Sequence, residues 1–243
     1  MVEKVIVHKA SCIALVMGVF TLAANAAVIS WDASSGLTPD QVGFELSDSS
    51  SPENPILASS ILTIGNNSAS ERMFYATREP TAALLFPSVF EAFFRMKFVS
   101  SSTSYAGRRA AGILVTVNAN TGSNLYIGND SIFLSADFTQ QGPSATVDTN
   151  DEFHDYVLRI EGTEVSVFQD GSLVLSGNTL DSEAAEIGTS PRVLFGDVTS
   201  LAYGTSEWQS FSHNAMAIPE PSSIVLMGGM GLALFRLRKN LFR

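Results

Sequence analysis

The chain has 243 residues, with 24 acidic and 14 basic side chains and a formal net charge of −10 at pH 7. Such an acidic chain is a poor partner for nucleic acid or for an anionic membrane surface, because both require clustered positive charge. The single cysteine, Cys12, lies near the N-terminus, so the rest of the chain depends on its core and not on disulfides for stability.

Residues 1–26 have the pattern of a secretory signal peptide. Lys4 and Lys9 make the start positive, residues 13–24 are apolar, and Ala24 and Ala26 form the Ala-x-Ala pattern that signal peptidase accepts. We therefore expect an exported protein whose mature chain begins at residue 27.

Residues 27–217 form one predicted domain, long enough to bury a core of its own. In residues 89–100 the apolar side chains, Phe90, Phe94 and Phe98 among them, alternate with charged ones. This alternation is typical of a strand with one buried face, so we predict a strand and not a helix here. The other strands predicted before residue 120 cover residues 28–31, 42–46, 61–64, 72–77 and 112–118.

Two hairpins are predicted in the second half of the domain. One turns at residues 128–130, and the other turns at Asp170 and Gly171, a pair that tolerates positive φ. Strands this regular, separated by turn residues, favour an antiparallel β-sandwich, and the lack of a fixed repeat argues against a propeller or solenoid. The strands predicted here cover residues 125–127, 132–134, 156–160, 165–167, 173–175, 192–195 and 208–212.

Two stretches of this region resemble the concanavalin A-like, laminin-G-type jelly rolls. They are FHDYVLRIEGTEVSVFQDGSLVLSG at residues 153–177, and LFGDVTSLAYGTSEWQSFSH at residues 194–213. The first pairs an aromatic residue with histidine before two hairpins, and the second places Phe-Gly-Asp before a loop and an aromatic-centred final strand. The resemblance implies an all-β antiparallel jelly-roll sandwich over residues 27–217.

The C-terminal residues 218–243 carry three features in a fixed order. Residues 223–235 are apolar on all sides, which is unlike an amphipathic helix packed on a domain. A Pro-Glu-Pro tripeptide precedes this segment and a basic end follows it. The residues are Pro219, Glu220 and Pro221 in the tripeptide and Arg236, Arg238, Lys239 and Arg243 in the basic end.

This tail resembles the PEP-CTERM sorting signal of Gram-negative bacteria. The resemblance implies a short transmembrane helix that anchors the protein transiently at the inner membrane, and then cleavage by an exosortase. It also implies a bacterium that makes exopolysaccharide, with the protein ending at the cell surface or outside the cell. A packed C-terminal helix or an ordinary short anchor is the alternative.

An acidic stretch before residue 156 is the nearest candidate for a reactive or metal-binding site. The glycosidases of the jelly-roll superfamily carry Glu-x-Asp-x-Glu on one strand, and no such pattern is present. Asp148, Asn150 and Glu152 offer oxygen ligands at alternate positions for calcium, although one short loop supplies few ligands and a solvated turn is the simpler interpretation. Gly196 and Asp197 form a second calcium candidate of equal strength, for which an aspartate that caps a turn is the alternative.

Other reactive patterns are missing from the sequence. His154 and His213 lack the spacing of a zinc site, and His154 and Asp155 are neighbours in a predicted strand, so they should point to opposite faces. Neither a nucleophile elbow nor a phosphate-binding glycine loop is present. We therefore expect a protein that is not an enzyme and has no cofactor except, as a candidate, calcium.

Aromatic side chains are the remaining candidates, because sugar rings stack on exposed aromatic faces. Trp208 is predicted to lie in the core, and Trp31 and Tyr126 fit either the core or a strand end. Tyr105 and Tyr203 lie among small residues in predicted loops and are the candidates for a binding rim.

The sequence therefore predicts an exported, sorted surface or matrix protein with a glycan-binding module linked to exopolysaccharide. The alternatives are a structural or protein-binding surface protein without sugar affinity and, more distantly, a glycosidase. The partners expected during export are signal peptidase, exosortase and the inner membrane.

Overall fold

The computed structural model describes residues 29–48, 54–68, 70–77, 84–103, 107–137, 140–181, 190–199 and 201–217. The regular structure in these ranges consists of strands and two short 3-10 helices. Those before residue 110 are β1 (Ile29–Asp32), η1 (Ala33–Ser35), η2 (Pro39–Gln41), β2 (Phe44–Asp48), β3 (Ile56–Ala58), β4 (Ile61–Asn66), β5 (Met73–Thr77), β6 (Leu84–Leu85) and β7 (Val89–Thr103). Those after it are β8 (Ala111–Asn118), β9 (Thr121–Gly128), β10 (Ser131–Ser135), β11 (Gln141–Thr146), β12 (His154–Glu161), β13 (Glu164–Gln169), β14 (Ser172–Asn178), β15 (Arg192–Asp197), β16 (Ala202–His213) and β17 (Met216–Ala217).

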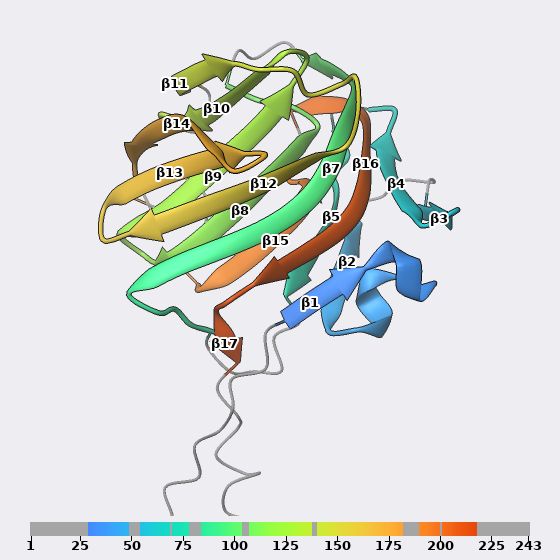
Figure 1. The fold of residues 1–243 in the computed structure, drawn as a ribbon, viewed down its shortest axis with the longest axis horizontal. Helices are drawn as coiled ribbons and strands as arrows, with labels where there is room; N and C mark the ends of the chain where they lie inside the picture. Colours follow the sequence, from blue (N-terminus) through green and yellow to red (C-terminus); the bar gives the residue numbers. More distant parts are fainter. Residues whose placement is uncertain are drawn as a thin grey trace, which may run out of the picture.

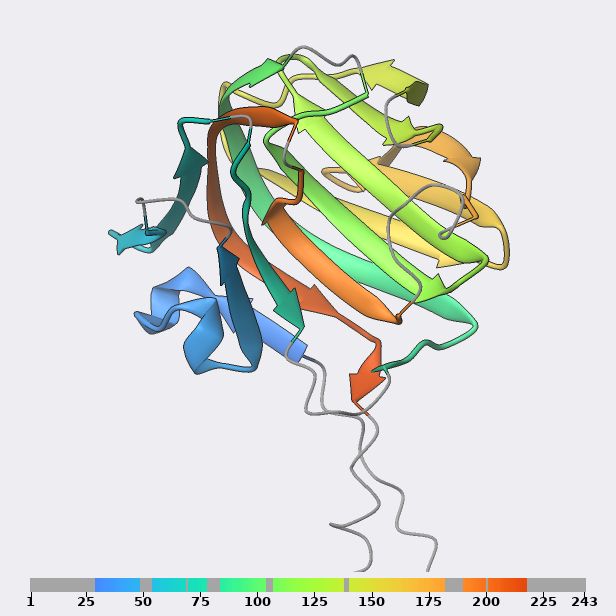
Figure 2. The ribbon, with the colours of Figure 1, turned by 180° about the vertical axis from the view of Figure 1, so that it is seen from behind.

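The strands form two large antiparallel sheets that pack face to face. Sheet A has eight strands in the order β14-β13-β12-β7-β16-β4-β3, with β1 beside β16, and faces the viewer in Figure 1. Sheet B has seven strands in the order β11-β10-β9-β8-β15-β5-β2 and faces the viewer in Figure 2. The predicted all-β antiparallel sandwich is therefore confirmed.

Strand β7 shows how the sequence pattern produces this arrangement. Phe90, Phe94 and Phe98 are buried between the sheets, while Phe93, on the other side of the strand, is 44% exposed. The predicted strand with one buried face is confirmed. Its neighbours β12 and β16 pair with it over most of its length.

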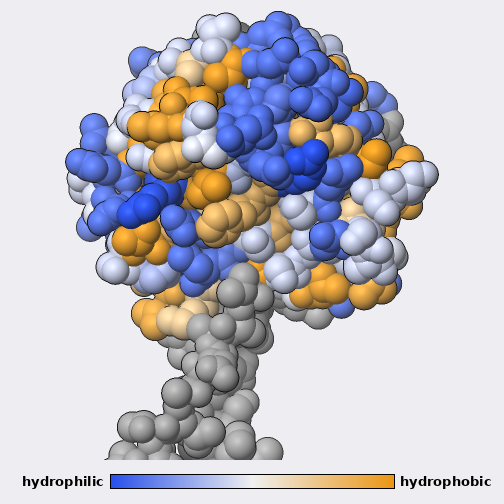
Figure 3. All heavy atoms as spheres, viewed as in Figure 1, coloured by the Kyte–Doolittle hydropathy of each residue, from blue (hydrophilic) through white to orange (hydrophobic). Residues whose placement is uncertain are grey.

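The outer face of sheet A is largely hydrophilic, with apolar patches among the polar atoms (Figure 3). Four apolar side chains face outward in register on neighbouring strands. We call them the sheet A apolar row: Phe93 on β7, Val157 on β12, Phe168 on β13 and Leu173 on β14.

The outer face of sheet B is unusual because it is buried as well. Its apolar side chains form a second core, separate from the one between the sheets. The buried members of this second core are Phe74, Leu114, Tyr126, Phe133, Leu194 and Val198.

The turns and the two ends of the domain complete the fold. Asp170 and Gly171 have φ of 50° and 79°, as the hairpin prediction requires, and Asp130 in the other predicted turn has φ of 51°. Ile29, at the start of the domain, pairs with His213, near its end. Both ends of the domain therefore lie at the same side, next to β17 (Figure 1).

The predicted signal peptide, residues 1–26, and the predicted sorting tail, residues 218–243, lie outside the described residues, as does Tyr105. Within the described ranges, no helix is both long and apolar enough to cross a membrane.

Candidate functional site

A row of aromatic rings crosses the outer face of sheet B. Phe133 on β10 is paired with Tyr126 on β9, which is paired with Gly112 on β8. Gly112 is paired with Gly196 on β15, and Gly196 with Phe74 on β5. A Cβ atom at Gly112 would lie only 3.1 Å from Cδ1 of Tyr126, so the tyrosine ring occupies the space beside this glycine.

Each ring of this row is covered by a guanidinium group. Such a cation is attracted to the negative face of the ring, and the contact also shields the ring from water. The distances from the guanidinium carbon to the ring centroid are 5.7 Å for Arg72 and Phe74, 5.5 Å for Arg108 and Tyr126, and 5.1 Å for Arg109 and Phe133. We call these six side chains the arginine–aromatic row.

The hydroxyl group of Tyr126 joins a buried polar network on this face. Arg108 Nη1 donates to it at 2.6 Å and Asn124 Nδ2 at 2.9 Å. Burial raises the pKa of Tyr126, although the charge of Arg108 and the hydrogen bonds oppose this. Two buried acceptors, Asn124 Oδ1 and Ser135 Oγ, have no hydrogen-bond partner in the described structure. Buried polar atoms of this kind mark places where water or a ligand completes the hydrogen bonding.

A pocket of about 400 Å³ lies beside the row, between β2, β5 and β15. Its volume is within the range of small-molecule sites, and its lining mixes an aromatic ring, hydroxyl groups and two charged side chains. The lining residues are Glu45, Ser47, Phe74, Ala76, Thr77, Ser190, Arg192 and Leu194.

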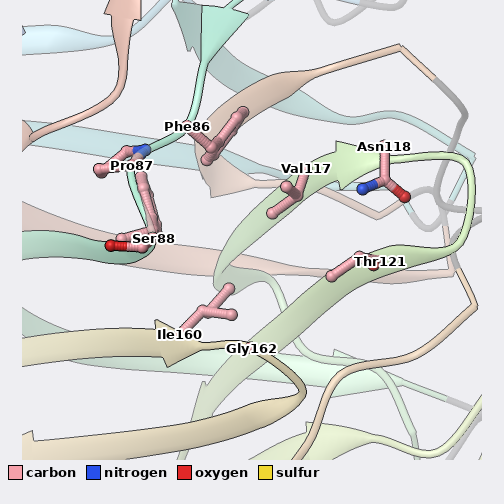
Figure 4. Close-up of a pocket in the computed structure, with 9 residues that line it drawn as sticks. Phe86, Pro87, Ser88, Val117, Asn118, Thr121, Ile160 and Gly162 are labelled. Atoms are coloured by element: carbon pink, nitrogen blue, oxygen red, sulfur yellow. The ribbon is translucent and has the colours of Figure 1, made fainter.

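Two smaller cavities lie elsewhere. One, of about 230 Å³, is surrounded by side chains from the segment before β7 and from β8, β9 and β12 (Figure 4). Phe86, Val117 and Ile160 are apolar residues of its lining, and Ser88, Asn118 and Thr121 are polar ones. The other, of about 270 Å³, lies beside Arg95 and Gln209 on sheet A. Arg95 is already bonded there to Gln209 and to Asp155, both at 2.9 Å.

His154 is held between two carboxylates, a contact that the sequence did not reveal. Its Nδ1 lies 2.7 Å from Asp170 and its Nε2 lies 2.9 Å from Asp151, so both ring nitrogens are engaged. Burial lowers the pKa of His154, but the hydrogen bonds and charges of Asp170 and Asp151 outweigh it and hold the pKa above its usual value. Two carboxylate acceptors require two N–H donors, which favours the charged imidazolium. Asp155 points away to Arg95, as predicted from strand alternation.

The three predicted calcium ligands lie in the loop between β11 and β12. The ligand atoms of Asp148 lie within 4.8 Å of those of Asp151 and His154. Asn150 instead donates to Asn129 Oδ1 at 2.5 Å, while Glu152 is exposed. Because His154 is already bonded to two carboxylates, this cluster is held together without an ion. Calcium binding here stays a prediction.

Asp197, in the second calcium candidate, is buried. It accepts hydrogen bonds from the Asn66 side chain and from the Thr199 backbone N–H. Burial raises its pKa to about 8, although these hydrogen bonds and the charge of Arg72 oppose the shift. Asn66 in turn accepts from the Gly204 N–H at 3.2 Å, so the group ties β15 to β4 and β16.

Tyr203, a predicted rim residue, is 38% exposed and lies in β16, not in a loop. The prediction of a loop around Tyr203 was wrong. This part of β16 forms by pairing with the long strand β7, where Tyr203 lies opposite Ser102, and its sequence has no apolar alternation that would mark a strand. Trp208 is fully buried, as predicted, and Trp31 and Tyr126 are also buried.

Carboxylates are missing from the middle of the candidate face. The outward side chains on the described strands β8 and β9 include Leu114, Thr116, Asn124 and Tyr126, and none is acidic. A glycosidase of the usual two-carboxylate type needs two such groups about 5–10 Å apart. The described part of these strands therefore lacks that arrangement.

Comparison with solved structures supports the jelly-roll fold. The carbohydrate esterase vb_24B_21 from Shiga toxin-encoding bacteriophage phi24B is similar with a TM-score of 0.54 and 14% identity, over 77% of this chain and 97% of that one. The apo Crh5 transglycosylase is similar with a TM-score of 0.53 and 14% identity, over 78% and 84% of the two chains. At these identities the similarity shows the fold alone. No family model matches the chain, and no curated protein matches it in sequence.

Proposed function

We propose that the domain is a non-catalytic glycan-binding module of an exported surface or matrix protein. The observation that carries this proposal is the outer face of sheet B, where the pocket of about 400 Å³ adjoins the arginine–aromatic row. Sugars offer many hydroxyl groups, and the pocket offers hydroxyls, Arg192 and Glu45 to bind them. The similar folds of a carbohydrate esterase and a transglycosylase support the carbohydrate ligand in this proposal and not its non-catalytic character.

The test is a pull-down of the purified protein with a panel of neutral and acidic polysaccharides, in calcium and in chelator. We expect saturable binding to at least one polymer. Loss of binding in chelator would show that the binding requires a metal ion, with the Asp148, Asn150 and Glu152 loop and Asp197 as its candidate ligands, whereas unchanged binding would remove the metal from the proposal. Release of reducing sugar would show a glycosidase and contradict the non-catalytic function.

A protein-binding function is the second candidate, and the sheet A apolar row favours it. Phe93 is 44% exposed and Leu173 is 57% exposed, and contiguous apolar surface of this kind often marks a protein interface. Failure of every polysaccharide in the panel to bind would contradict the glycan proposal and leave this one.

We also propose that the protein is exported by its signal peptide and sorted by its PEP-CTERM tail. Both ends of the domain leave at one side, next to β17, so a membrane anchor at residues 223–235 would follow the domain at that end of the sandwich. In a host that has an exosortase, the mature protein should lack the residues near and after Pro219, as measured by intact mass. An unprocessed C-terminus in that host would contradict sorting.

A further inference from the structure

We infer that Asp148, Asp151 and His154 form a binding site for a divalent transition-metal ion, with zinc as its representative. The site lies where the loop between β11 and β12 enters β12. It differs from the calcium candidate in the same loop, because it uses a histidine nitrogen and leaves out Asn150 and Glu152. The inference is independent of the glycan-binding function proposed above.

The first observation is the distance between the ligand atoms. One ligand atom from each of Asp148, Asp151 and His154 lies within 4.8 Å of the other two. His154 Nε2 is the nitrogen beside Asp151, whose Oδ1 lies 2.9 Å away. A tetrahedral zinc ion with bonds of about 2.0–2.2 Å holds its ligands about 3.4 Å apart. Small movements of the two exposed aspartate side chains are therefore enough to bring the three groups around one ion.

His154 is held in the orientation that a metal ligand needs. Its Nδ1 lies 2.7 Å from Asp170 Oδ2, and Asp170 Oδ1 accepts from the Asp155 backbone N–H at 3.0 Å. A ligand histidine usually donates its second N–H to a carboxylate, which fixes the ring and makes the other nitrogen a better ligand. We therefore assign this supporting role to Asp170. The ion binds Nε2 in place of the proton between Nε2 and Asp151, and that proton passes to solvent.

The backbone of the loop is already fixed by neighbouring elements. The Thr149 carbonyl accepts from the Phe98 N–H of β7 at 2.8 Å, and the Thr149 hydroxyl donates to the Gly128 carbonyl at 2.6 Å. The Asp148 carbonyl accepts from the side chain of Gln169 on β13. A site whose backbone is already ordered loses less conformational entropy when its ligand binds.

The second, independent observation is a buried hydroxyl group next to the cluster. Tyr156 is 1% exposed, and its hydroxyl has no hydrogen-bond partner among the residues that the structure describes. It lies two residues after His154 on the inner face of β12, and the two rings meet edge to face at 6.2 Å. The residue paired with Tyr156 on β13 is Gln169, whose side chain bonds the loop at Asp148.

The carboxylates of the cluster act on this hydroxyl group. Burial raises the pKa of Tyr156, and the charges of Asp170, Asp151 and Asp148 add to the shift. Three protein ligands leave one position of a tetrahedral zinc ion to water. A water on the ion gives the Tyr156 hydroxyl the partner that the described residues do not supply.

The donor set selects the kind of ion. Calcium takes roughly six to eight oxygen ligands, whereas this cluster offers two carboxylates and an imidazole nitrogen. Imidazole suits zinc and other first-row divalent transition ions. The spacing of His154 and His213 does not fit a zinc site made of two histidines, but here the folded loop supplies aspartates as the other ligands.

The test is a titration of the purified full-length protein with zinc chloride, followed by the heat of binding and by the unfolding temperature. We expect one zinc ion to bind at this cluster. At about a hundredfold excess over its dissociation constant, zinc should raise the unfolding temperature by about 5–10 °C, because an ion that binds only the folded state stabilises it. Calcium chloride is the comparison and should give a smaller rise.

The variant Asp148→Asn/Asp151→Asn replaces two exposed carboxylates by amides of the same shape. It should weaken zinc binding by about tenfold or more, since even the loss of a supporting group costs this much. The matched control is Glu152→Gln/Asp155→Asn, which removes the same charge from the same stretch and should bind zinc like the unchanged protein. Because this control also removes Glu152, it weakens calcium binding at the calcium candidate while zinc binding stays.

A second measurement needs no variant. Nitrogen-15 NMR of the imidazole rings follows His154 and His213 as zinc is added. The His154 Nε2 signal should shift, whereas that of His213, which is buried and lies 2.8 Å from the Thr77 hydroxyl, should stay in place.

Four outcomes would overturn the inference. They are equal zinc binding in Asp148→Asn/Asp151→Asn and the unchanged protein, an equal loss in both double variants, an unshifted His154 Nε2 signal at saturating zinc, and a calcium-induced rise in unfolding temperature as large as that with zinc. Polysaccharide binding is measured separately, so its failure would contradict the glycan-binding function and leave the metal site standing.

Discussion

Replacing Phe195 with alanine is expected to lower the free energy of unfolding by about 3–5 kcal/mol, the usual cost of truncating a buried phenylalanine. The ring is fully buried on β15 and packs against rings from both sheets. Its centroid lies 4.3 Å from that of Phe211 and 5.2 Å from that of Trp208, both on sheet A. On sheet B it lies 5.4 Å from Tyr75. Urea unfolding measures the loss.

The control is Phe93→Ala, the same truncation at an exposed position of β7. It should cost less than about 1 kcal/mol, because the Phe93 ring is already partly in water. Equal losses in the two variants would contradict the assignment of Phe195 to the centre of the core.

The second large effect is on the pH dependence of stability. We expect the free energy of unfolding to be nearly level between pH 4 and 6.5 and to fall between pH 6.5 and 8. Burial raises the pKa of Asp197 to about 8, so the folded protein keeps a proton that the unfolded chain releases above about pH 4, and stability falls as pH rises. Burial lowers the pKa of His213 to about 4, so stability rises with pH up to 6.5, the usual histidine value.

Between pH 4 and 6.5 Asp197 and His213 change the free energy of unfolding in opposite directions, each by up to about 1.4 kcal/mol per pH unit. Above pH 6.5 His213 no longer opposes the effect of Asp197. His154 adds to the loss, because the stability from a histidine with a raised pKa is lost as pH rises through that pKa. Urea unfolding at a series of pH values measures the curve.

In Asp197→Asn the free energy of unfolding is expected to rise with pH between pH 4 and 6.5, because the effect of His213 is then no longer opposed. The control is Asp155→Asn, an exposed carboxylate that pairs with Arg95 and should leave the shape of the curve unchanged. A level curve between pH 4 and 6.5 in Asp197→Asn would contradict the assignment.

Local patterns predicted much of this fold. The alternation in β7 marked its buried face, and Asp170-Gly171 marked the β13–β14 turn, because both signals lie within a few residues. Strand β11, at the edge of sheet B, was missed because its sequence, Gln-Gly-Pro-Ser-Ala-Thr, has no large apolar residue and contains Gly and Pro, which are depleted in strands. Such an edge strand is held by pairing with β10 and not by an apolar pattern.

The candidate site was much harder to predict. The arginine–aromatic row depends on the strand order β10-β9-β8-β15-β5, which places Phe74 in the same row as Phe133 although they are far apart in the chain. Likewise, His154 meets Asp170 only because the β12–β13 hairpin is followed by the turn into β14. Only the strand register reveals these contacts, whereas residue types and spacing do not.

The pairing of Ile29 with His213 has a mechanical consequence. Because the two ends of the domain lie side by side, the folded domain adds almost no length between the segments that precede and follow it. A force that pulls these segments apart acts across the antiparallel β1–β16 pair from one end, so it opens the backbone hydrogen bonds one pair at a time. Under tension β1 should therefore detach first, while the rest of sheet A and the whole of sheet B's outer face remain intact.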